Sequence, residues 1–456
     1  MSNPGLPGPA DERRPPDAHD QVRSVVVVGA GLAGARTVAT LRAHGFDGHL
    51  TVLGAEGVAP YDRPPLSKAL LERTEPAWLT EELGIDLPDL ADDIRFGEPA
   101  AGLTADASGV EIRTSRDHAG SRSRTSSTLR ADIVVLACGS HASRPAGWEA
   151  ALTLHTAADA ARLREALTPG SRLIVIGAGW IGAEVAGVAA AAGVEVTVVE
   201  AGDAPLARQL GESIGALTAP WYTAAGIRLL TGTAVDTVDD AGVLLTDGRY
   251  LPADVVLAAT GAAPATGWLN ESVPLTARRA VPVDSAGRLD VPRGVSSARL
   301  AATDAARVWA VGDCADRWTA RFGDVAGGHW SGALSHPEAV ACAITGAAAP
   351  AEAAPSVFSQ QLGHYLTLIG IPAAGSDVVH RGAPEGGDGW TTLWFSPATR
   401  DAPGNAAGRE LLAVLTVDRP RDVGPARRLL SGRRPSRLDL ARATDPSVHL
   451  SEAVVD

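Results

Sequence analysis

The chain has 456 residues, of which 45% are hydrophobic and 20% are charged. This length exceeds what one hydrophobic core organises and predicts two or three domains. Its 40 basic and 53 acidic side chains give a net charge of −13, which argues against nucleic acid as the main partner. Charged residues, glycine and proline interrupt every apolar run before the length of about 20 residues that a membrane helix needs, so we expect no membrane span.

Residues 1–21 contain Pro, Asp, Glu and Arg but no apolar core. This composition predicts a disordered extension rather than a secretory signal, and we expect a cytoplasmic protein. The three cysteines, Cys138, Cys314 and Cys342, are too far apart in sequence for a CxxC or CxxxxC motif. The sequence therefore predicts neither a redox-active thiol pair nor a metal site, and each cysteine is expected to act as a small apolar residue.

A strand, a glycine loop and a helix are predicted near the N-terminus. Val25–Val28 is a β-branched strand, and Leu32–Ala43 has helical spacing. Between them lie Gly29, Gly31 and Gly34, a GxGxxG fingerprint. The first glycine permits a tight turn, the second lets backbone approach a pyrophosphate, and the third lets helix pack on strand. The phosphates would lie at the helix N-terminus, where unpaired N–H groups favour negative charge.

A second strand, Leu50–Leu53, precedes Glu56, which lies about 22 residues beyond Gly34. At that spacing a carboxylate can accept hydrogen bonds from an adenosine ribose. The alternative for Glu56 is a solvated acid at the end of a strand. Short strands and a Ser/Arg-rich hairpin near Asp117 to Ser127 are expected next. A buried strand, Ile133–Leu136, then leads to a glycine turn.

The same pattern recurs in a second unit. The strand Leu173–Ile176 leads into Gly177, Gly179 and Gly182, and Glu200 lies about 18 residues beyond the last of these glycines. Ala and Gly follow Glu200 where an arginine would favour a 2′-phosphate. Because a carboxylate repels that phosphate, we expect this unit to prefer NADH to NADPH, although a solvated strand-end acid is again the alternative.

Two fingerprints in the strand–turn–helix context predict two bound dinucleotides, and such a protein most simply passes electrons between them. The strand Val255–Ala258 of the second unit is followed by a glycine turn, as in the first. Val308–Asp313 is a further strand ending at an acid, expected to return to the first unit. Strands near 366–369, 391–395 and 411–417, with an Arg-rich helix at 423–430, predict a C-terminal α+β domain.

The predicted fold class is therefore α/β, with two Rossmann-like dinucleotide-binding domains and a C-terminal α+β domain. The expected boundaries are 1–21 for the extension, 22–144 and 266–326 for a discontinuous first dinucleotide-binding domain, 145–265 for a second dinucleotide-binding domain, and 327–456 for the C-terminal domain.

Five segments together resemble the NADH-dependent ferredoxin reductases. These are FAD flavoproteins of the pyridine nucleotide-disulfide oxidoreductase superfamily that include putidaredoxin reductase and rubredoxin reductase. The segments are Val25–Gly34, Pro60–Lys68, Gly177–Glu184, Val311–Asp313 and Arg419–Asp422. The resemblance extends from about Val22 to Leu450. The glycine loops alone indicate the superfamily, and the run ending at Lys68 makes the resemblance specific.

The resemblance implies a fold of the glutathione-reductase type. The discontinuous first domain, 22–144 and 266–326, would be the FAD-binding domain, 145–265 would be the NAD(H)-binding domain, and 327–456 would be an interface domain. Lys68 would lie near the flavin N5, with Glu184 paired to it, so these two residues are the expected catalytic pair. A cation held by a carboxylate can polarise the flavin without leaving a buried charge unpaired. The implied FAD-binding residues are Gly29, Gly31, Gly34, Glu56, Arg63, Lys68, Gly139, Asp313 and Trp330. The alternatives are a solvated lysine after a proline turn for Lys68 and a tryptophan that packs at an interface for Trp330. The implied NAD-binding residues are Gly177, Gly179, Trp180, Ile181, Gly182, Glu184, Glu200 and Gly261.

The implied reaction transfers a hydride from NADH to flavin N5 and then single electrons to a [2Fe-2S] ferredoxin, which would supply a monooxygenase such as a cytochrome P450. Because ferredoxins are usually acidic, docking needs a basic surface on this acidic protein. The candidates are Arg419, Arg421, Arg427, Arg428, Arg433, Arg434 and Arg437. Solvated or internally paired arginines are the alternative.

Three departures from the family pattern lie on the flavin or acceptor side. Cys138 replaces a usual threonine, Gly328 replaces a glutamate, and Phe358 begins Phe-Ser-Gln-Gln where the family has Trp-Ser-Asp-Gln. They leave two alternatives open. One is an NADH-dependent flavin oxidase or small-molecule reductase, and the other is an NADH-sensing flavoprotein resembling apoptosis-inducing factor. The sequence leaves the oligomeric state, monomer or homodimer, undecided.

Overall fold

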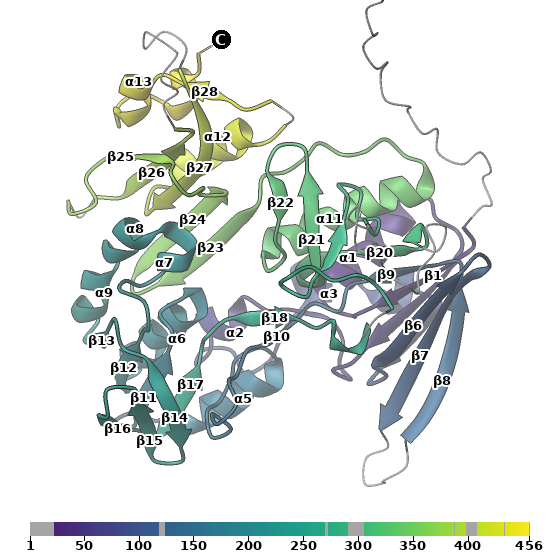
Figure 1. Cartoon of the computed structure of the whole chain (residues 1–456), viewed down its shortest axis with the longest axis horizontal. Coiled ribbons are helices and arrows are strands. Elements are labelled where there is room, and N and C mark those ends of the chain that lie inside the picture. The colour runs from purple at the N-terminus through teal and green to yellow at the C-terminus, as the bar shows by residue number, and fades with distance from the viewer. Residues whose placement is uncertain are drawn as a thin grey trace, which may run out of the picture.

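The structure is a computed structural model, and it describes residues 22–117, 124–269, 272–290, 305–386, 388–397, 408–432 and 434–455. The predicted extension at 1–21, the tip of the hairpin at 118–123 and Arg433 lie outside the described residues. Figure 1 shows the chain passing from a first α/β unit into a second one, back to the first, and finally into a C-terminal sheet. None of the described helices is long and apolar enough to cross a membrane.

The first unit is built on a parallel sheet whose strands, apart from the half-buried edge strand β5, are buried on both faces. Its order is β20 (Val308–Ala310), β9 (Ile133–Leu136), β1 (Ser24–Val28), β2 (His49–Gly54) and β5 (Asp93–Phe96). Alternate residues of β1 enter different cores, since Val25 and Val27 pack toward α1 (Leu32–Ala43) while Val26 and Val28 pack on the other side. The strand expected before Asp313 therefore returns to this sheet, as predicted.

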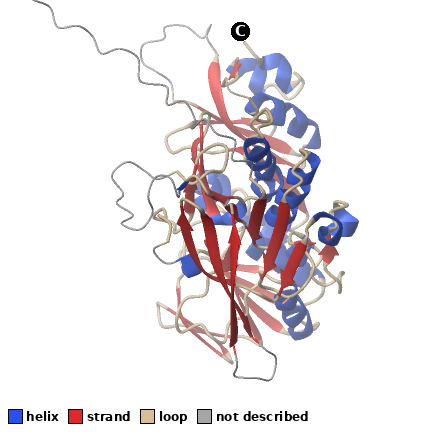
Figure 2. Cartoon of the chain, turned by 90° about the vertical axis from the view of Figure 1, so that its right-hand side faces the viewer, coloured by secondary structure: helices blue, strands red, loops and turns tan. Residues whose placement is uncertain are grey.

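Helices and an antiparallel sheet cover the two faces of this sheet. α11 (Trp330–Thr345) packs along α1 on one face. The other face packs against β6 (Ala100–Asp106), β7 (Gly109–Asp117) and β8 (Arg124–Ala131), the long strands facing the viewer in Figure 2. The remaining elements of this unit are β3 (Tyr61–Asp62), α2 (Pro65–Lys68), β4 (Ala77–Trp78), α3 (Leu79–Glu82), α4 (Leu87–Leu90), β19 (Val281–Val283), β21 (Ala315–Thr319) and β22 (Gly323–Val325).

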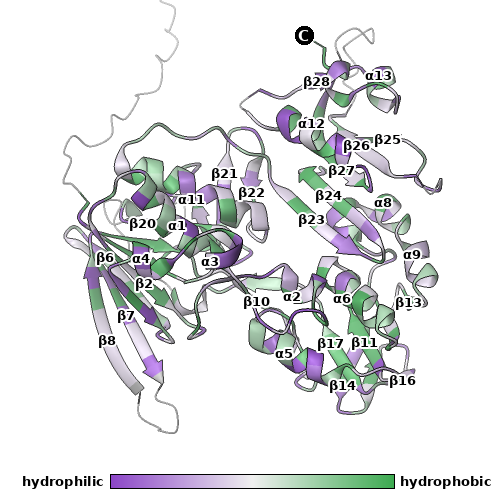
Figure 3. Ribbon diagram, turned by 180° about the vertical axis from the view of Figure 1, so that it is seen from behind, coloured by the Kyte–Doolittle hydropathy of each residue, from purple (hydrophilic) through white to green (hydrophobic). Residues whose placement is uncertain are grey.

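The second unit repeats this plan. Its parallel sheet has the order β13 (Arg228–Leu230), β12 (Glu195–Val199), β11 (Arg172–Ile176) and β17 (Val255–Ala258), so β11 and β12 correspond to β1 and β2. Figure 3 shows β11 and β17 as strongly hydrophobic, as expected for buried strands. The other elements are α5 (Ala157–Ala166), α6 (Trp180–Ala191), α7 (Ala207–Leu210), α8 (Glu212–Ala216), α9 (Ala219–Ala224), β14 (Val235–Asp239), β15 (Gly242–Leu245) and β16 (Tyr250–Pro252).

Two crossing strands connect the units. β10 (Ser140–Ala142) and β18 (Ala262–Pro264) pair antiparallel directly after the glycine turns at Gly139 and Gly261. The side chain of Thr260 donates a hydrogen bond to the carbonyl of Ser143 at 2.8 Å. The carboxyl ends of both parallel sheets therefore meet at one paired connection, which fixes the two glycine loops relative to each other.

The C-terminal unit is an antiparallel sheet packed between a helix and the second unit. Its main order is β23 (Ser356–Gln361), β24 (His364–Gly370), β27 (Arg409–Val417), β26 (Trp390–Phe395) and β25 (Asp377–Arg381), with β28 (Arg437–Leu438) pairing with β27. One face packs on α12 (Pro420–Leu430), and the other packs on α7 and α8. α13 (Leu440–Thr444) completes the unit. The fold class predicted from the sequence is confirmed, including the strands expected near 366–369, 391–395 and 411–417, whereas the exact domain boundaries stay a prediction.

Candidate active site

Both glycine loops have the geometry that the fingerprint requires. A Cβ added to Gly29 would lie 2.0 Å from the carbonyl oxygen of Ala137, at a φ of +120°, so only glycine fits this turn. A Cβ added to Gly34 would lie 1.8 Å from the carbonyl oxygen of Gly29, which shows how closely helix and loop approach. Around Gly31, no atom of the described residues lies within 4 Å of such a Cβ. The first cradle is therefore closed at Gly29 and Gly34 and open at Gly31.

The second cradle repeats this arrangement. A Cβ on Gly177 would meet the carbonyl oxygen of Ala259 at 2.5 Å, and one on Gly182 would meet the carbonyl oxygen of Gly177 at 2.1 Å. At Gly179 the nearest atom within the described residues is 3.9 Å away. Gly139 and Gly261, at the ends of β9 and β17, have positive φ and open space of the same kind.

Both helices that follow these loops have N-termini suited to phosphate. Gly31 and Gly179 are the N-cap residues of α1 and α6, and no side chain among the described residues caps either helix. No acidic residue lies in either first turn, so nothing in these turns repels an anion. The unpaired N–H groups and the helix dipole fit a dinucleotide pyrophosphate at each cradle.

The two strand-end acids lie in different positions. Glu200 directly follows β12 and accepts hydrogen bonds from the backbone N–H groups of Ala178 at 2.7 Å and Gly202 at 2.8 Å, so it lies at the second glycine loop. By strand register the equivalent residue of the first unit is Gly54, where a Cβ would meet Ala30 at 2.9 Å. Glu56 lies two residues farther along.

Glu56 has its own partners. It pairs with Arg63 and accepts a hydrogen bond from the hydroxyl of Tyr61 at 2.5 Å. Tyr61 in turn accepts a hydrogen bond from the backbone N–H of Ala157 at the start of α5. Burial, with a smaller contribution from the Glu56 hydrogen bond and opposition from Arg63, raises the pKa of Tyr61 to about 12. Glu56 and Arg63 thus lie in a polar link between the two units, and their predicted contacts with FAD stay predictions.

The predicted catalytic pair forms in the structure. The Nζ of Lys68 lies 2.8 Å from Oε1 of Glu184, which joins α2 of the first unit to α6 of the second. Glu184 is only 3% exposed. Two hydroxyls also donate to it: Ser67 Oγ at 2.5 Å from Oε2, and Ser359 Oγ at 2.6 Å from Oε1. A buried carboxylate with this set of partners holds the ammonium group in one place.

Lys68 is the only lysine in the chain, although the chain contains many arginines. An ammonium is a compact point charge, whereas a guanidinium is a planar fork, so arginine does not substitute for lysine where one small cation must fit. This compositional signal in the sequence is enough to single out Lys68. The hydroxyl of Ser359 has no such signal, because it comes from β23 in the C-terminal unit.

Aromatic side chains extend this network. The Phe358 ring lies 4.9 Å from the Nζ of Lys68, and Trp330 packs edge-on against Phe358 with a centroid distance of 5.6 Å. Trp330 donates a hydrogen bond from Nε1 to Asp62 at 2.8 Å. Burial raises the pKa of Asp62, and this hydrogen bond opposes the rise. Phe358, which departs from the family pattern, therefore still contacts Lys68.

Asp313 lies where the two connecting strands start. It accepts a hydrogen bond from Ser140 Oγ at 2.9 Å. His329, just before α11, is half-buried, and its buried Nδ1 has no hydrogen-bond partner among the described residues. Burial lowers the pKa of His329, with Asp313 acting in the opposite direction. A buried polar atom without a partner beside an open cradle is consistent with a ligand at this place.

The thiols of Cys138 and Cys314 contact each other near the same strand ends. Cys314 is buried, and Cys138 is half-buried. The sequence spacing gives no sign of this contact. Of the residues expected at the nicotinamide, Ile181 exposes 44% of its surface in the first turn of α6, while Trp180 packs partly against the C-terminal sheet.

Comparisons with known proteins agree with this geometry. Residues 23–344 match the family described as Pyridine nucleotide-disulphide oxidoreductase, and residues 357–454 match the Reductase C-terminal family. The chain belongs to this oxidoreductase family. It is an oxidoreductase of the ferredoxin reductase type, and family membership implies that it binds FAD and NAD(H).

Similar proteins extend over almost the whole chain. The chain is 33% identical to the ferredoxin reductase component of chlorobenzene dioxygenase from Cupriavidus sp. (strain PS12), covering 94% of this chain and 97% of that protein. It is 30% identical to rhodocoxin reductase from Rhodococcus erythropolis, covering 94% of each chain. A crystal structure of a covalent putidaredoxin reductase–putidaredoxin complex is similar at 26% identity, with a TM-score of 0.79, covering 94% of this chain and 98% of that chain.

The open side of the first cradle leads to a prediction. Gly31 has a φ of −77°, which alanine also adopts, and an added Cβ would meet open space. The apoprotein of the Gly31→Ala variant should therefore fold with an unchanged thermal midpoint. Its affinity for FAD should fall at least about 10-fold, because the methyl group takes space needed by the pyrophosphate. Gly34→Ala is the matched control, since its Cβ meets backbone and should lower the thermal midpoint itself. Wild-type FAD affinity in the Gly31→Ala variant, measured by titrating the apoprotein, would contradict this assignment.

Proposed function

We propose that the protein is an NADH:ferredoxin reductase that passes electrons through FAD to a [2Fe-2S] ferredoxin of an oxygenase system. The observation that carries this proposal is the Lys68–Glu184 pair that joins α2 of the first unit to α6 of the second, with the carboxylate buried and the Lys68 side chain 18% exposed. Similarity to the reductase components of dioxygenase systems and to a reductase in complex with putidaredoxin supports the acceptor class. A cytochrome P450 monooxygenase and a dioxygenase are both compatible terminal partners.

FAD, when bound in the first cradle, supplies the chemistry that accepts a hydride and returns single electrons. The protein contributes position and charge. Lys68 presents a cation where negative charge develops, and Glu184 holds that cation through the 2.8 Å contact. Ser67 and Ser359 fix the two carboxylate oxygens, so the ammonium needs little reorganisation.

The catalytic pair leads to a kinetic prediction. Glu184→Gln keeps the side-chain shape but removes the charge that positions Lys68, so flavin reduction by NADH should slow about 10- to 100-fold while FAD stays bound. Lys68→Met should slow flavin reduction at least as much, whereas Lys68→Arg should retain a rate between those of Lys68→Met and the wild type. Anaerobic rapid mixing with NADH measures this step directly. Wild-type rates in both Glu184→Gln and Lys68→Met would remove the pair from the mechanism.

Coenzyme choice provides an independent prediction. Because Glu200 lies at the second glycine loop, we expect kcat/KM for NADH to exceed that for NADPH by at least about 100-fold, which corresponds to about 2.7 kcal/mol. Glu200→Ala should narrow the ratio by about 10-fold or more, mainly by improving NADPH. The matched control is Glu195→Ala at the exposed start of the same strand, which should leave the ratio unchanged. An equal ratio in wild type and Glu200→Ala would contradict the assignment.

The acceptor is tested by reducing the FAD-loaded protein with NADH without oxygen and then adding candidate [2Fe-2S] ferredoxins, with cytochrome c as the final reporter. Cytochrome c reduction that depends on both NADH and ferredoxin is the expected result. Rapid oxygen uptake or organic-substrate reduction without ferredoxin would instead favour the oxidase or small-molecule reductase. Slow flavin reduction with a long-lived charge-transfer complex and NADH-dependent dimerisation would favour the NADH-sensing flavoprotein.

The predicted basic surface divides into exposed and internal residues. Arg419 is mostly buried beside Asp422, so it serves the C-terminal core, whereas Arg427 and Arg428 are exposed on α12. The other exposed members among the described residues are Arg421, Arg434 and Arg437. α12 lies on the face of the C-terminal sheet opposite α7 and α8. A ferredoxin held there would contact the protein away from the NAD(H)-binding unit.

This surface leads to a test by salt and charge. Turnover with ferredoxin should fall as ionic strength rises, and ferricyanide reduction should change much less. Replacing Arg427 and Arg428 with Ser should raise the KM for ferredoxin about fivefold or more without changing ferricyanide reduction. Arg130→Ser, at an exposed arginine on β8, is the matched control. A flat salt response with ferredoxin, or an unchanged KM in the double variant, would rule out docking on this surface.

A further inference from the structure

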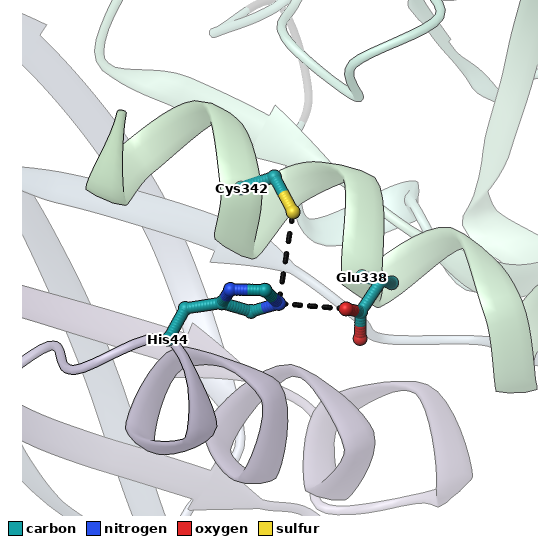
Figure 4. Close-up of side chains that lie close together, drawn as sticks. All are labelled: His44, Glu338 and Cys342. Carbon is teal, nitrogen blue, oxygen red and sulfur yellow. Dashed lines mark hydrogen bonds and ion pairs between the residues drawn. The ribbon is translucent and has the colours of Figure 1, made fainter. Parts of the chain in front are cut away.

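We propose that His44, Glu338 and Cys342 form a binding site for a divalent transition metal ion, with Zn²⁺ as the best match. Figure 4 shows the three side chains converging between α1 and α11. Within the part of the chain that the structure describes, this is the one group of three or more possible ligands whose donor atoms lie within 4.8 Å of one another. The site is separate from both nucleotide cradles, because His44 is the C-cap residue of α1 and the FAD cradle lies at the other end of that helix.

The distances suit a tetrahedral metal. Sγ of Cys342 lies 3.6 Å from Nε2 of His44. Typical Zn–S and Zn–N bonds at a tetrahedral angle place these two atoms about 3.5 Å apart, so neither side chain has to move far. Oε1 of Glu338 lies 2.6 Å from the same nitrogen, as a direct ion pair or hydrogen bond. In a tetrahedral zinc site this oxygen and this nitrogen lie about 3.4 Å apart, so a bound metal would lengthen their distance by about 0.8 Å.

The exposure of His44 and Glu338 leaves these side chains room to move and gives a metal ion a path into the site. Cys342 is 2% exposed, whereas the side chains of His44 and Glu338 are 27% and 36% exposed. The buried thiol would therefore form the inner side of the site, and the carboxylate would close it from solvent. Glu338 and Cys342 are four residues apart on α11 and so lie on the same helix face. Three ligands leave a fourth tetrahedral position for water.

The donor set selects the class of ion. Thiolate, imidazole and carboxylate together are typical zinc ligands, whereas Mg²⁺ and Ca²⁺ prefer oxygen alone. Burial, and to a lesser degree the charge of Glu338, raises the pKa of the Cys342 thiol. A divalent cation would reverse the effect of both by stabilising the thiolate beside the carboxylate.

This proposal departs from the expectation of no metal site drawn from the sequence. His44 is separated from Glu338 by 294 residues and from Cys342 by 298 residues, so no motif of ligand spacing could show the cluster. A metal here would tie the helix that carries the FAD cradle to the helix that begins at Trp330. Binding of the ion to the folded state alone would stabilise this contact.

Cobalt provides a sensitive probe, because tetrahedral Co²⁺ with a thiolate ligand gives intense d–d bands at wavelengths longer than the flavin absorption. FAD-loaded protein, first treated with a chelator, is titrated with Co²⁺ and then with Zn²⁺. We expect one equivalent of Co²⁺ to produce these bands, Zn²⁺ to abolish them by displacement, and Zn²⁺ to raise the thermal midpoint of unfolding.

Three variants and one control decide the assignment. Cys342→Ser and His44→Asn should each weaken binding at least about 100-fold, and Glu338→Gln at least about 10-fold, with NADH–ferricyanide activity unchanged. His49→Asn is the control, because His49 lies 3.9 Å from Asp92 on an exposed surface of the same unit without a thiol. Absence of the bands in wild type, or bands that persist in Cys342→Ser or His44→Asn, would overturn the proposal and leave His44 and Glu338 as an ordinary ion pair.

Discussion

The arrangement of the active site depends on one buried carboxylate. Glu184 lies on the second unit, its cation Lys68 on the first, and one of its hydroxyl donors, Ser359, on the C-terminal unit. A carboxylate that is 3% exposed is stable only if its charge and lone pairs are matched, so the three units must meet in one geometry for the pair to exist. The contact that supports the proposed hydride transfer is therefore also a contact that assembles the protein.

The two copies of the unit share the same backbone geometry at their glycine loops and differ after the second strand. Gly29 and Gly177 both lie where a side chain would collide with the next strand end, and each copy leaves its second glycine open. The copies diverge after the second strand, where Glu200 occupies the place that Gly54 has in the first unit. One cradle thus carries a carboxylate at its loop and the other does not, which is consistent with two different dinucleotides.

The features predicted from the sequence are those that depend on local pattern. The β-branched runs, the glycine loops, the α1 bounds and the family run ending at Lys68 all depend on residues close together in the chain, and the structure has the predicted fold class. Contacts made by distant segments carry no such pattern. Ser359 reaching Glu184, Cys138 touching Cys314, and His44 meeting Cys342 each depend on how the units pack. The partners of Glu56, Arg63 and Tyr61, are also not given by the spacing rule, and its predicted contact with the FAD ribose stays a prediction.

The most direct test of the central claim is a crystal structure of the FAD-loaded protein, reduced without oxygen and bound to NAD⁺. The account predicts the nicotinamide stacked on the flavin beside Lys68, with the 2.8 Å contact between Lys68 and Glu184 retained and the adenosine ribose at Glu200. A nicotinamide bound away from Lys68, or a flavin in the second cradle, would contradict the account.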